Sequence, residues 1–381
     1  MKSPLTAAIA AQLIERIQDG RMPSGQALPS ERELSIEFGA SRGVIRAAIS
    51  ELALKGFIEV KPRCRPTVAM RNRRAQSIVN GKSNIAIWLW PNTGDYAAAS
   101  ILKGIQSADI GNEFNLVVAN AVDGDWDSIF ESEAKFLLES SQDPQVAGLI
   151  IWYLGAERNL PALRSIRDAH IPIVFVDRQP PTEFCADFVG THNEGAAQRA
   201  VQHLIELGHR HIALLSNIEP VSSVRERESG YIRALRESGI PFRPEYIIRD
   251  QEDGPEGVDS LLDQILSMET PPTAIFAVND HIALQVCDAL RERKIAIPNQ
   301  MSVIGFDGLL RWVPGGGYLT TSLQDFERIG RLSAELVYHR MGLGTTDACR
   351  HILLDAPLLV RGTTAPPIHR NSSLHSSFPK H

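Results

Sequence analysis

The sequence lacks the features that mark membrane and secreted proteins. No apolar run approaches the roughly 18 residues that span a bilayer, and the N-terminal stretch carries Glu15 and Asp19, unlike a signal peptide. The cysteines show no CxxC spacing, so they predict neither a zinc site nor a disulfide framework. These cysteines are Cys64, Cys185, Cys287 and Cys349. We therefore expect a cytoplasmic protein.

Recognisable catalytic motifs are also absent from the sequence. It contains no HExxH, no GxSxG and no complete glycine-rich phosphate loop. His203, His209 and His211 cluster in the sequence, but a basic loop between a helix and a strand explains them better than a metal site does. The sequence therefore predicts a protein that is not an enzyme and that holds no metal and no cofactor.

The formal net charge of −6 conceals an uneven distribution of charge along the chain. Residues 1–82 contain 14 Lys and Arg against 7 Asp and Glu, whereas the remainder contains 25 against 38. A basic N-terminal region on an acidic body suits a protein that lays one end on DNA, which is a polyanion. A modest bias of this kind also occurs in unrelated proteins, so the charge split needs support from the local pattern.

The basic region carries the signals of two short helices joined by a turn. Ser30 caps the first helix and Glu33 completes a capping box, while Gly39 is a left-handed stop. Ser41 then caps a second helix, whose apolar positions Ile45, Ala48, Ile49 and Leu52 share one face. A helix before this module is predicted by apolar residues at every fourth position, namely Leu5, Ile9, Leu13 and Ile17.

Arg42 and Arg46 project together from the opposite face of the second helix, because they are four residues apart. A short helix, a tight turn and a second helix with arginines near its start have the geometry that enters a DNA major groove. The plain alternative is an exposed helix face that only improves solubility. Residues 57–60 and 67–69 can pair as a hairpin, with Arg63 and Arg65 at its tip to meet phosphate or a minor groove.

This region resembles the winged helix-turn-helix of the GntR family of bacterial transcription regulators. The matching segments are LPSEREL, FGASR and IRAAISELALKGFI with the strand after it. The usual wing tip of that family is Gly-x-Gly-Thr, where this chain has Arg63-Cys64-Arg65-Pro66-Thr67. Pattern and resemblance together imply binding to duplex DNA. The expected contacts are Arg32, Ser41, Arg42, Gly43, Arg46, Arg63, Arg65 and Thr67.

From residue 84 the sequence alternates between apolar strand-like runs and helical patterns. The expected strands are 85–90, 115–119, 146–152, 171–176, 211–215, 245–248, 273–278 and 301–306, with further strands near 350–361. The expected helices are 97–110, 126–140, 158–169, 192–207, 226–238, 256–267, 280–293 and 324–341. Such alternation predicts an α/β fold with parallel sheets covered on both faces, and its two successive runs indicate two similar lobes.

Polar residues stand where several of the expected strands end, and ligands of open α/β sheets bind at those ends. The candidate effector-binding residues are Tyr96, Asp177, Arg227, Asn279 and Asp307. A polyhydroxylated ligand suits such groups, because each hydroxyl both donates and accepts a hydrogen bond. Two alternatives remain open: Arg227 and Asp307 can form a structural salt bridge, and Asp177 and Asn279 can be helix caps or turn residues.

The second region resembles the ligand-binding core of LacI-family regulators, which is similar to periplasmic sugar-binding proteins. The segments that carry this resemblance include IVFVDR, LIELGHRHIALL, RERESGYIRAL, FAVNDHIAL, MSVIGFDG and LTTSLQDFERIG. The resemblance implies a sugar-like effector in contact with Asp177, Arg227, Asn279 and Asp307. The loop PNTGDYAAAS departs from the usual Asn-Pro-Phe-Phe pattern of the family.

These features predict a DNA-binding transcriptional regulator, most simply a repressor, whose operator affinity is controlled by a small sugar or sugar derivative bound between the two lobes. We expect a winged helix-turn-helix domain at 1–70, a linker at 71–83, a two-lobed effector domain at 84–365 and a disordered tail at 366–381. A homodimer on a palindromic operator is implied, and no membrane is involved. The alternatives are a sugar-responsive activator and a carbohydrate-binding protein without a role in DNA regulation.

Overall fold

The chain folds into two units, each assembled from segments that are far apart in sequence. The computed structural model describes residues 4–18, 21–23, 25–54, 57–60, 65–68, 83–89, 96–108, 114–120, 125–217, 221–250, 255–308, 316–343 and 348–368. The first unit comprises Met1–Val176, Pro180–Val189 and Glu327–His351, and the second comprises Asp177–Gln179, Gly190–Phe326 and Ile352–His381. The chain therefore crosses from one unit to the other several times.

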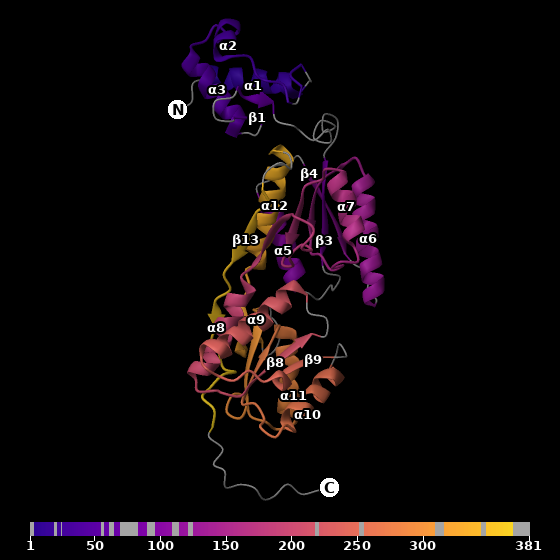
Figure 1. The fold of residues 1–381 in the computed structure, drawn as a ribbon, viewed down its shortest axis with the longest axis vertical. Helices are drawn as coiled ribbons and strands as arrows, with labels where there is room; N and C mark the ends of the chain where they lie inside the picture. Colours follow the sequence, from indigo (N-terminus) through magenta and orange to yellow (C-terminus); the bar gives the residue numbers. More distant parts are fainter. Residues whose placement is uncertain are drawn as a thin grey trace, which may run out of the picture. The chain divides into compact units, whose positions relative to one another are not determined.

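Three helices and a two-stranded hairpin form the N-terminal head (Figure 1). They are α1 (Pro4–Gln18), α2 (Glu31–Glu37), α3 (Arg42–Leu54), β1 (Ile58–Glu59) and β2 (Thr67–Val68). Leu13 of α1 and Ile45 and Leu52 of α3 are fully buried in their shared core. The prediction of an N-terminal helix that packs on the module is thus confirmed, although Leu5 at its start is 48% exposed.

The local signals read at the helix ends of the head are also confirmed. The backbone N–H of Glu33 donates to Ser30 Oγ at 3.2 Å, and the backbone N–H of Ser30 donates to Glu33 Oε2 at 2.6 Å, which completes the capping box. Gly39 has a φ of 60°, as a left-handed stop requires. The wing strands pair antiparallel, with Ile58 opposite Val68. The wing tip at 61–64 lies outside the described residues.

The first six-stranded sheet is covered by helices on both faces. In sheet order its strands are β13 (His351–Leu354), β7 (Asp187–Thr191), β6 (Ile173–Val176), β5 (Val146–Ile151), β3 (Ser83–Leu89) and β4 (Phe114–Asn120). Figure 1 shows α6 (Trp126–Gln142) and α7 (Leu160–Asp168) on one face, with α5 (Tyr96–Ser107) and α12 (Phe326–Leu343) on the other. Helices α5 and α12 approach closely, since a Cβ on Gly104 would lie 1.9 Å from the carbonyl oxygen of Glu327.

The second six-stranded sheet has the same layered arrangement. In order its strands are β14 (Leu358–Leu359), β12 (Thr320–Leu323), β11 (Ser302–Asp307), β10 (Ala274–Ala277), β8 (Ile212–Asn217) and β9 (Ile247–Asp250). Figure 1 shows α8 (Asn193–Glu206) and α9 (Ser222–Glu237) on one face, and α10 (Pro255–Leu266) and α11 (Asp280–Glu292) on the other. The central pairs are parallel, and only the pairing of β14 with β12 is antiparallel among the strand pairs described in this sheet. The carboxyl ends of β8, β10 and β11 therefore meet at one edge.

The predicted α/β class with parallel sheets is confirmed, but strands β7 and β12 were missed. Their sequences, DFVGT and TTSL, contain hydroxyl groups and a carboxyl where a buried strand ordinarily carries hydrocarbon. Both nevertheless lie inside a sheet, because their polar side chains find partners there. Thr321 donates to Asp280 at 2.6 Å, and Asp187 accepts from Arg340.

The expectation of no disulfide is wrong for one pair of cysteines. Cys185 and Cys349 form a disulfide, with their Cα atoms 6.4 Å apart and a sequence separation of 164 residues. Spacing motifs report only cysteines that are close along the chain, so this pair gave no signal. The partners meet because α12 returns the chain to the first sheet beside the segment that leads into β7.

Within the described residues, no helix is both long enough and apolar enough to cross a bilayer.

Candidate functional site

Several exposed arginines of the head lie near the first turn of α2. Arg42 and Arg46 are both exposed on α3, whose start is capped by a hydrogen bond from the Val44 N–H to Ser41 Oγ at 3.4 Å. Arg46 donates two hydrogen bonds to the carboxylate of Glu31, from Nε to Oε1 at 3.0 Å and from Nη2 to Oε2 at 2.8 Å. These bonds lower the pKa of Glu31, and the charges of Arg46 and Arg42 add to the effect.

The other residues predicted to meet DNA lie on the same module. Arg32 and Gly43 are exposed, Arg65 is exposed, and Thr67 is partly buried in β2. The Ser30 hydrogen bonds lower the pKa of Glu33, and the charge of Arg65 lowers it further, which places Arg65 near α2. The head therefore gathers Arg42, Arg46 and Arg65 around one helix start. Arg63 lies outside the described residues.

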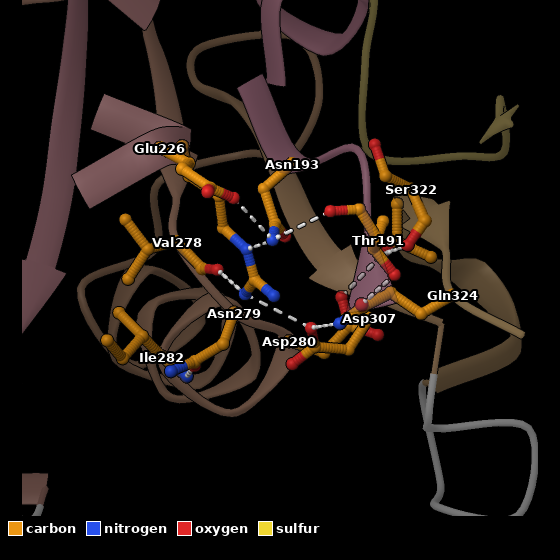
Figure 2. Close-up of polar contacts among 12 residues, drawn as sticks. Thr191, Asn193, Glu226, Val278, Asn279, Asp280, Ile282, Asp307, Ser322 and Gln324 are labelled. Carbon is orange, nitrogen blue, oxygen red and sulfur yellow. Dashed lines mark hydrogen bonds and ion pairs between the residues drawn. The ribbon is translucent and has the colours of Figure 1, made fainter. Parts of the chain in front are cut away.

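A buried polar cluster in the second unit is centred on Arg227, near the start of α9 (Figure 2). Arg227 is 4% exposed, and its guanidinium stacks on the ring of Phe306, with Cζ 3.9 Å from the ring centre. Its Nε donates to Asn193 Oδ1 at 3.0 Å, and its Nη1 donates to the carbonyl of Val278 at 2.6 Å. Nη1 also lies 3.1 Å from Asp307 Oδ1. One buried cation is thus fixed by groups from three elements.

The partners of Arg227 are linked to one another, so that the hydrogen bonds close into a ring. Gln324 Nε2 donates to Asp307 Oδ1 at 2.7 Å, and Thr191 Oγ1 donates to Gln324 Oε1. Asn193 Nδ2 donates to the carbonyl of Thr191 at 3.2 Å, which returns the path to Arg227. Figure 2 shows this convergence of Thr191, Asn193, Asp307 and Gln324. Such a ring fixes the direction of every group in it.

Glu226, the neighbour of Arg227, extends the ring toward the crossover at 177–179. Its Oε2 accepts from Asn193 Nδ2 at 3.0 Å, and its Oε1 accepts from Gln179 Nε2. The backbone N–H of Gln179 donates in turn to Ser222 Oγ at 2.9 Å. The polar network therefore reaches a segment where the chain passes between units.

Burial dominates the electrostatics of the cluster. It raises the pKa of Asp307 to about 8, although Arg227 acts to lower it. Burial also raises the pKa of Asp177 and of Glu226. Asp177 is 5% exposed, and its Oδ1 has no hydrogen-bond partner among the described residues. A buried acceptor without a donor is costly, so the Oδ1 atom of Asp177 is available to accept a hydrogen bond from a ligand.

Backbone conformation marks the same two aspartates. Asp177 has a φ of 60° and Asp307 a φ of 115°, values that residues with a Cβ rarely adopt. Strained backbone of this kind persists where the surrounding structure holds it, and it gathers at ligand sites. Asp177 follows β6 of the first sheet and Asp307 ends β11 of the second, and the charge of Asp177 acts on Asp307.

The structure brings together three of the five residues predicted to bind an effector. Arg227 and Asp307 are in direct contact, and the charge of Asp177 acts on Asp307 and on Glu226. Asn279 takes the alternative role, because its side chain accepts from the Ile282 N–H at 2.8 Å and caps α11. Tyr96 belongs to the first unit, where it is 45% exposed at the start of α5.

Several members of the cluster were not singled out from the sequence. They are Thr191, Asn193, Glu226 and Gln324. Glu226 and Gln324 stand inside the RERESGYIRAL and LTTSLQDFERIG segments, so a signal was present for these two. Thr191 and Asn193 adjoin a strand that the sequence did not reveal, which left no position from which to infer their direction.

Comparison with known proteins agrees with both halves of this architecture. Residues 5–68 match the bacterial regulatory proteins of the gntR family, and residues 201–364 match the periplasmic binding protein-like domain. The HTH-type transcriptional repressor PurR of Vibrio atlanticus is 30% identical over 243 residues, which cover 64% of this chain and 70% of PurR. The chain belongs to the LacI/GntR-type transcriptional regulators.

Relatives within the LacI/GntR-type regulators extend the match to nearly the whole chain. The arabinose metabolism transcriptional repressor of Geobacillus stearothermophilus is 24% identical over 359 residues, 93% of this chain and 95% of that protein. A LacI family regulator from Enterococcus faecium, solved with bound ribose, is 24% identical and covers 74% of this chain and 99% of its own, with a TM-score of 0.63. This second likeness shows the fold. The prediction of a DNA-binding regulator rather than an enzyme is confirmed by these relatives.

Proposed function

We propose that this LacI/GntR-type regulator is a sequence-specific repressor whose operator affinity is controlled by a small sugar-like effector bound at the Arg227 cluster. The observation that carries the proposal is a buried set of polar groups that remains incompletely satisfied at Asp177. A structural cluster is expected to satisfy all of its members. An unpartnered buried acceptor is instead expected where a ligand supplies the donor.

A polyhydroxylated effector suits the chemistry of this cluster. Its hydroxyl groups donate to the carboxylate of Asp177 and accept from Arg227, and such charge-assisted hydrogen bonds are strong. Asp307, which holds a proton up to about pH 8, can donate to a hydroxyl oxygen. Bound ribose in the Enterococcus faecium regulator, and arabinose in the name of the Geobacillus relative, support a sugar as the class of effector. Tyr96 and Asn279 remain proposed members of the site.

The head supplies the DNA-binding surface in this proposal. The contacting residues are Arg32, Ser41, Arg42, Gly43, Arg46, Arg63, Arg65 and Thr67. Arg42 and Arg46 contact base edges or phosphates from α3. The pair of Arg46 with Glu31 is exposed, so the guanidinium can exchange the carboxylate for a DNA phosphate. Phosphate contacts make the affinity depend steeply on salt.

Assembly and location follow from the same proposal. A twofold homodimer presents two copies of α3 to a palindromic operator, with half-sites about one helical turn apart. The regulator acts in the cytoplasm, where its operator is. We keep a division into a head at 1–70, a linker at 71–83 and an effector domain at 84–365; residues 369–381 of the expected tail lie outside the described residues.

The test is to select an operator from random duplex DNA and to measure its complex by fluorescence anisotropy. The proposal expects tight, salt-dependent binding of the selected duplex and release of that duplex by one of a panel of sugars. Arg236→Ala is a matched control for head arginines, since Arg236 is exposed on α9. Failure to select any sequence, or sugars without effect on a selected operator, would contradict the corresponding half of the proposal.

A further inference from the structure

The exposed face of α3 presents one long side chain among small ones. The side chain of Arg46 is 69% exposed, and the exposed positions beside it carry Gly43, Ala47 and Ser50. A Cβ placed on Gly43 would meet no atom closer than 3.9 Å. Small residues let a helix lie deep in a major groove. Arg42 stands one turn earlier, at the first residue of α3, so Arg46 is the side chain best placed to reach base edges from the middle of this face.

Glu31 occupies one edge of the Arg46 guanidinium and leaves the other edge open. Its carboxylate accepts from Nε at 3.0 Å and from Nη2 at 2.8 Å. A guanidinium carries five N–H donors in a planar fork, so both N–H groups of Nη1 and the second one of Nη2 remain. Neighbouring N–H groups of Nη1 and Nη2 form the pair that O6 and N7 of guanine accept in the major groove.

The charge of Glu31 also bears on what that open edge can bind. The hydrogen bonds from Arg46 lower the pKa of Glu31, so the carboxylate is ionised at neutral pH. An ionised carboxylate beside Arg46 offsets the attraction of the arginine for a phosphate and itself repels the phosphate. An uncharged base edge meets no such repulsion. The pair of Arg46 with Glu31 therefore suits a base better than it suits the DNA backbone.

We infer that Glu31 is a positioning residue, which holds Arg46 so that the open edge of its guanidinium reads a guanine. The inference rests on the proposed function, and it selects a base contact for Arg46 over exchange of Glu31 for a phosphate. A flexible arginine loses rotamer freedom when it binds. Glu31 restricts Arg46 before DNA arrives, so less freedom is lost on binding. Glu31 contacts no base in this arrangement and acts through Arg46.

The experiment measures base discrimination by the full chain. An operator is selected from random duplex DNA, each of its base pairs is changed in turn, and the affinities are measured by fluorescence anisotropy. One guanine should lose its preference in Arg46→Ala. Replacing that guanine by a deazaguanine without the N7 acceptor should weaken binding of the unmodified chain by at least about fivefold. The same replacement should leave binding by Arg46→Ala unchanged.

Glu31→Gln keeps the shape of the side chain and removes the charge that orients Arg46. Discrimination at the Arg46 position should fall by at least about fivefold. Binding to a random duplex should stay the same or become tighter, because one negative charge has left the surface that faces DNA. A loss of folding would weaken both kinds of binding, so these two measurements separate positioning from a structural role.

Glu37→Gln is the matched control for this variant. Glu37 ends the same helix, its side chain is 40% exposed, and it pairs with Arg16. It loses the same charge from the same module, and its discrimination should equal that of the unmodified chain. The double variant Glu31→Gln/Arg46→Ala should discriminate as Arg46→Ala does, because a residue that acts through Arg46 has no effect without it.

The other outcomes overturn the inference in distinguishable ways. Tighter binding of operator and random duplex by Glu31→Gln, with full discrimination, would show that a phosphate replaces Glu31. A further loss of discrimination in the double variant would show that Glu31 contacts a base itself. Equal affinity for the deazaguanine operator would remove the guanine contact. If no sequence can be selected, the proposed DNA-binding function itself fails.

Discussion

The buried pair Arg340–Asp187 in the first unit and the buried pair Arg227–Asp307 in the second differ in how completely they are satisfied. Arg340 Nε and Nη2 reach both oxygens of Asp187, at 2.6 and 2.8 Å, and both side chains are 5% exposed. Arg340 also donates to the Ala348 carbonyl, and the Arg350 N–H donates to Asp187 at 2.7 Å. Every oxygen of that carboxylate has a donor.

In the second pair, one nitrogen of Arg227 lies 3.1 Å from Asp307. The nearby Asp177 has an oxygen without a hydrogen-bond partner among the described residues. The same two residue types thus serve different ends. The Arg340–Asp187 pair joins two segments of chain and leaves no polar atom for a ligand to bind. The Arg227–Asp307 cluster lowers stability through its unsatisfied groups, and a ligand that satisfies them restores this stability. The difference teaches that buried charge becomes a site where its hydrogen bonds are left incomplete.

The largest difference between the two pairs is expected in the cost of removing their arginines. Arg340→Met should lower the free energy of unfolding by roughly 3–5 kcal/mol, because it leaves Asp187 buried without its cation. Arg227→Met should cost less, since Asp307 already takes up a proton readily. Urea denaturation measures both, with the exposed pair of Arg291 as control: Arg291→Met should cost less than about 1 kcal/mol. Equal losses at Arg340 and Arg227 would remove the distinction.

The disulfide further stabilises the region of the Arg340–Asp187 pair. Cys349 precedes Arg350, whose backbone N–H donates to Asp187, so a disulfide and a hydrogen bond fix the same stretch of chain. Cys185→Ser should destabilise the protein by about 2–4 kcal/mol, with no change in sugar affinity. Denaturation with and without a reducing agent checks this, and Cys287→Ser, at the free buried cysteine, serves as the thiol control. Insensitivity of the unmodified chain to reductant would show that the bond is not formed.

An exposed arginine gives the opposite pattern of effects. Arg46→Ala should weaken operator binding by about 1–3 kcal/mol and reduce the salt slope by about one, while the free energy of unfolding changes by no more than about 0.5 kcal/mol. Arg46 is 69% exposed, so its pair with Glu31 adds little to stability. Anisotropy titrations at several salt concentrations test this against Arg236→Ala. Full operator affinity in the Arg46 variant would remove that residue from the interface.

Asp307 is expected to make the stability of the chain depend on pH. Its pKa rises from an ordinary 3.8 to about 8 on folding, so the folded chain holds a proton that the unfolded chain releases between these values. Its contribution to stability is therefore complete below the lower value and is lost as the pH rises through about 8, with a slope of at most about 1.4 kcal/mol per pH unit.

Asp307→Asn provides the reference for that dependence. The difference in unfolding free energy between the unmodified chain and the variant should shift against the unmodified chain as the pH rises from 5 to about 8. Thermal and urea denaturation across this range measure it. A difference that is flat with pH would mean that Asp307 is ionised throughout, as an ordinary salt-bridge partner is.

Much of the fold was predictable because hydrophobic periodicity records burial. The alternation after residue 84 predicted the layers of both sheets, and Ser30, Glu33 and Gly39 predicted the ends of α2. Strands β7 and β12 were missed because each buries polar side chains that are satisfied by distant partners, and hydrophobic periodicity does not register such residues.

The site was predictable only in part, for a related reason. Arg227 and Asp307 lie within recognisable segments, and their pairing was among the alternatives left open. Asn193 and Gln324 complete the ring from positions more than a hundred residues apart, so their meeting depends on the tertiary fold. The unsatisfied oxygen of Asp177 is a property of three-dimensional packing, and no local pattern in the sequence carries it.

The most direct test of the account is the response of an operator complex to a stabilising sugar, measured by anisotropy in the unmodified chain and in Asp307→Asn. The account predicts equal operator affinity without sugar, release from the unmodified chain on titration, and no release from the variant at the same concentrations. Release from Asp307→Asn at unchanged sugar concentration would contradict the assignment of this cluster as the place where the effector acts.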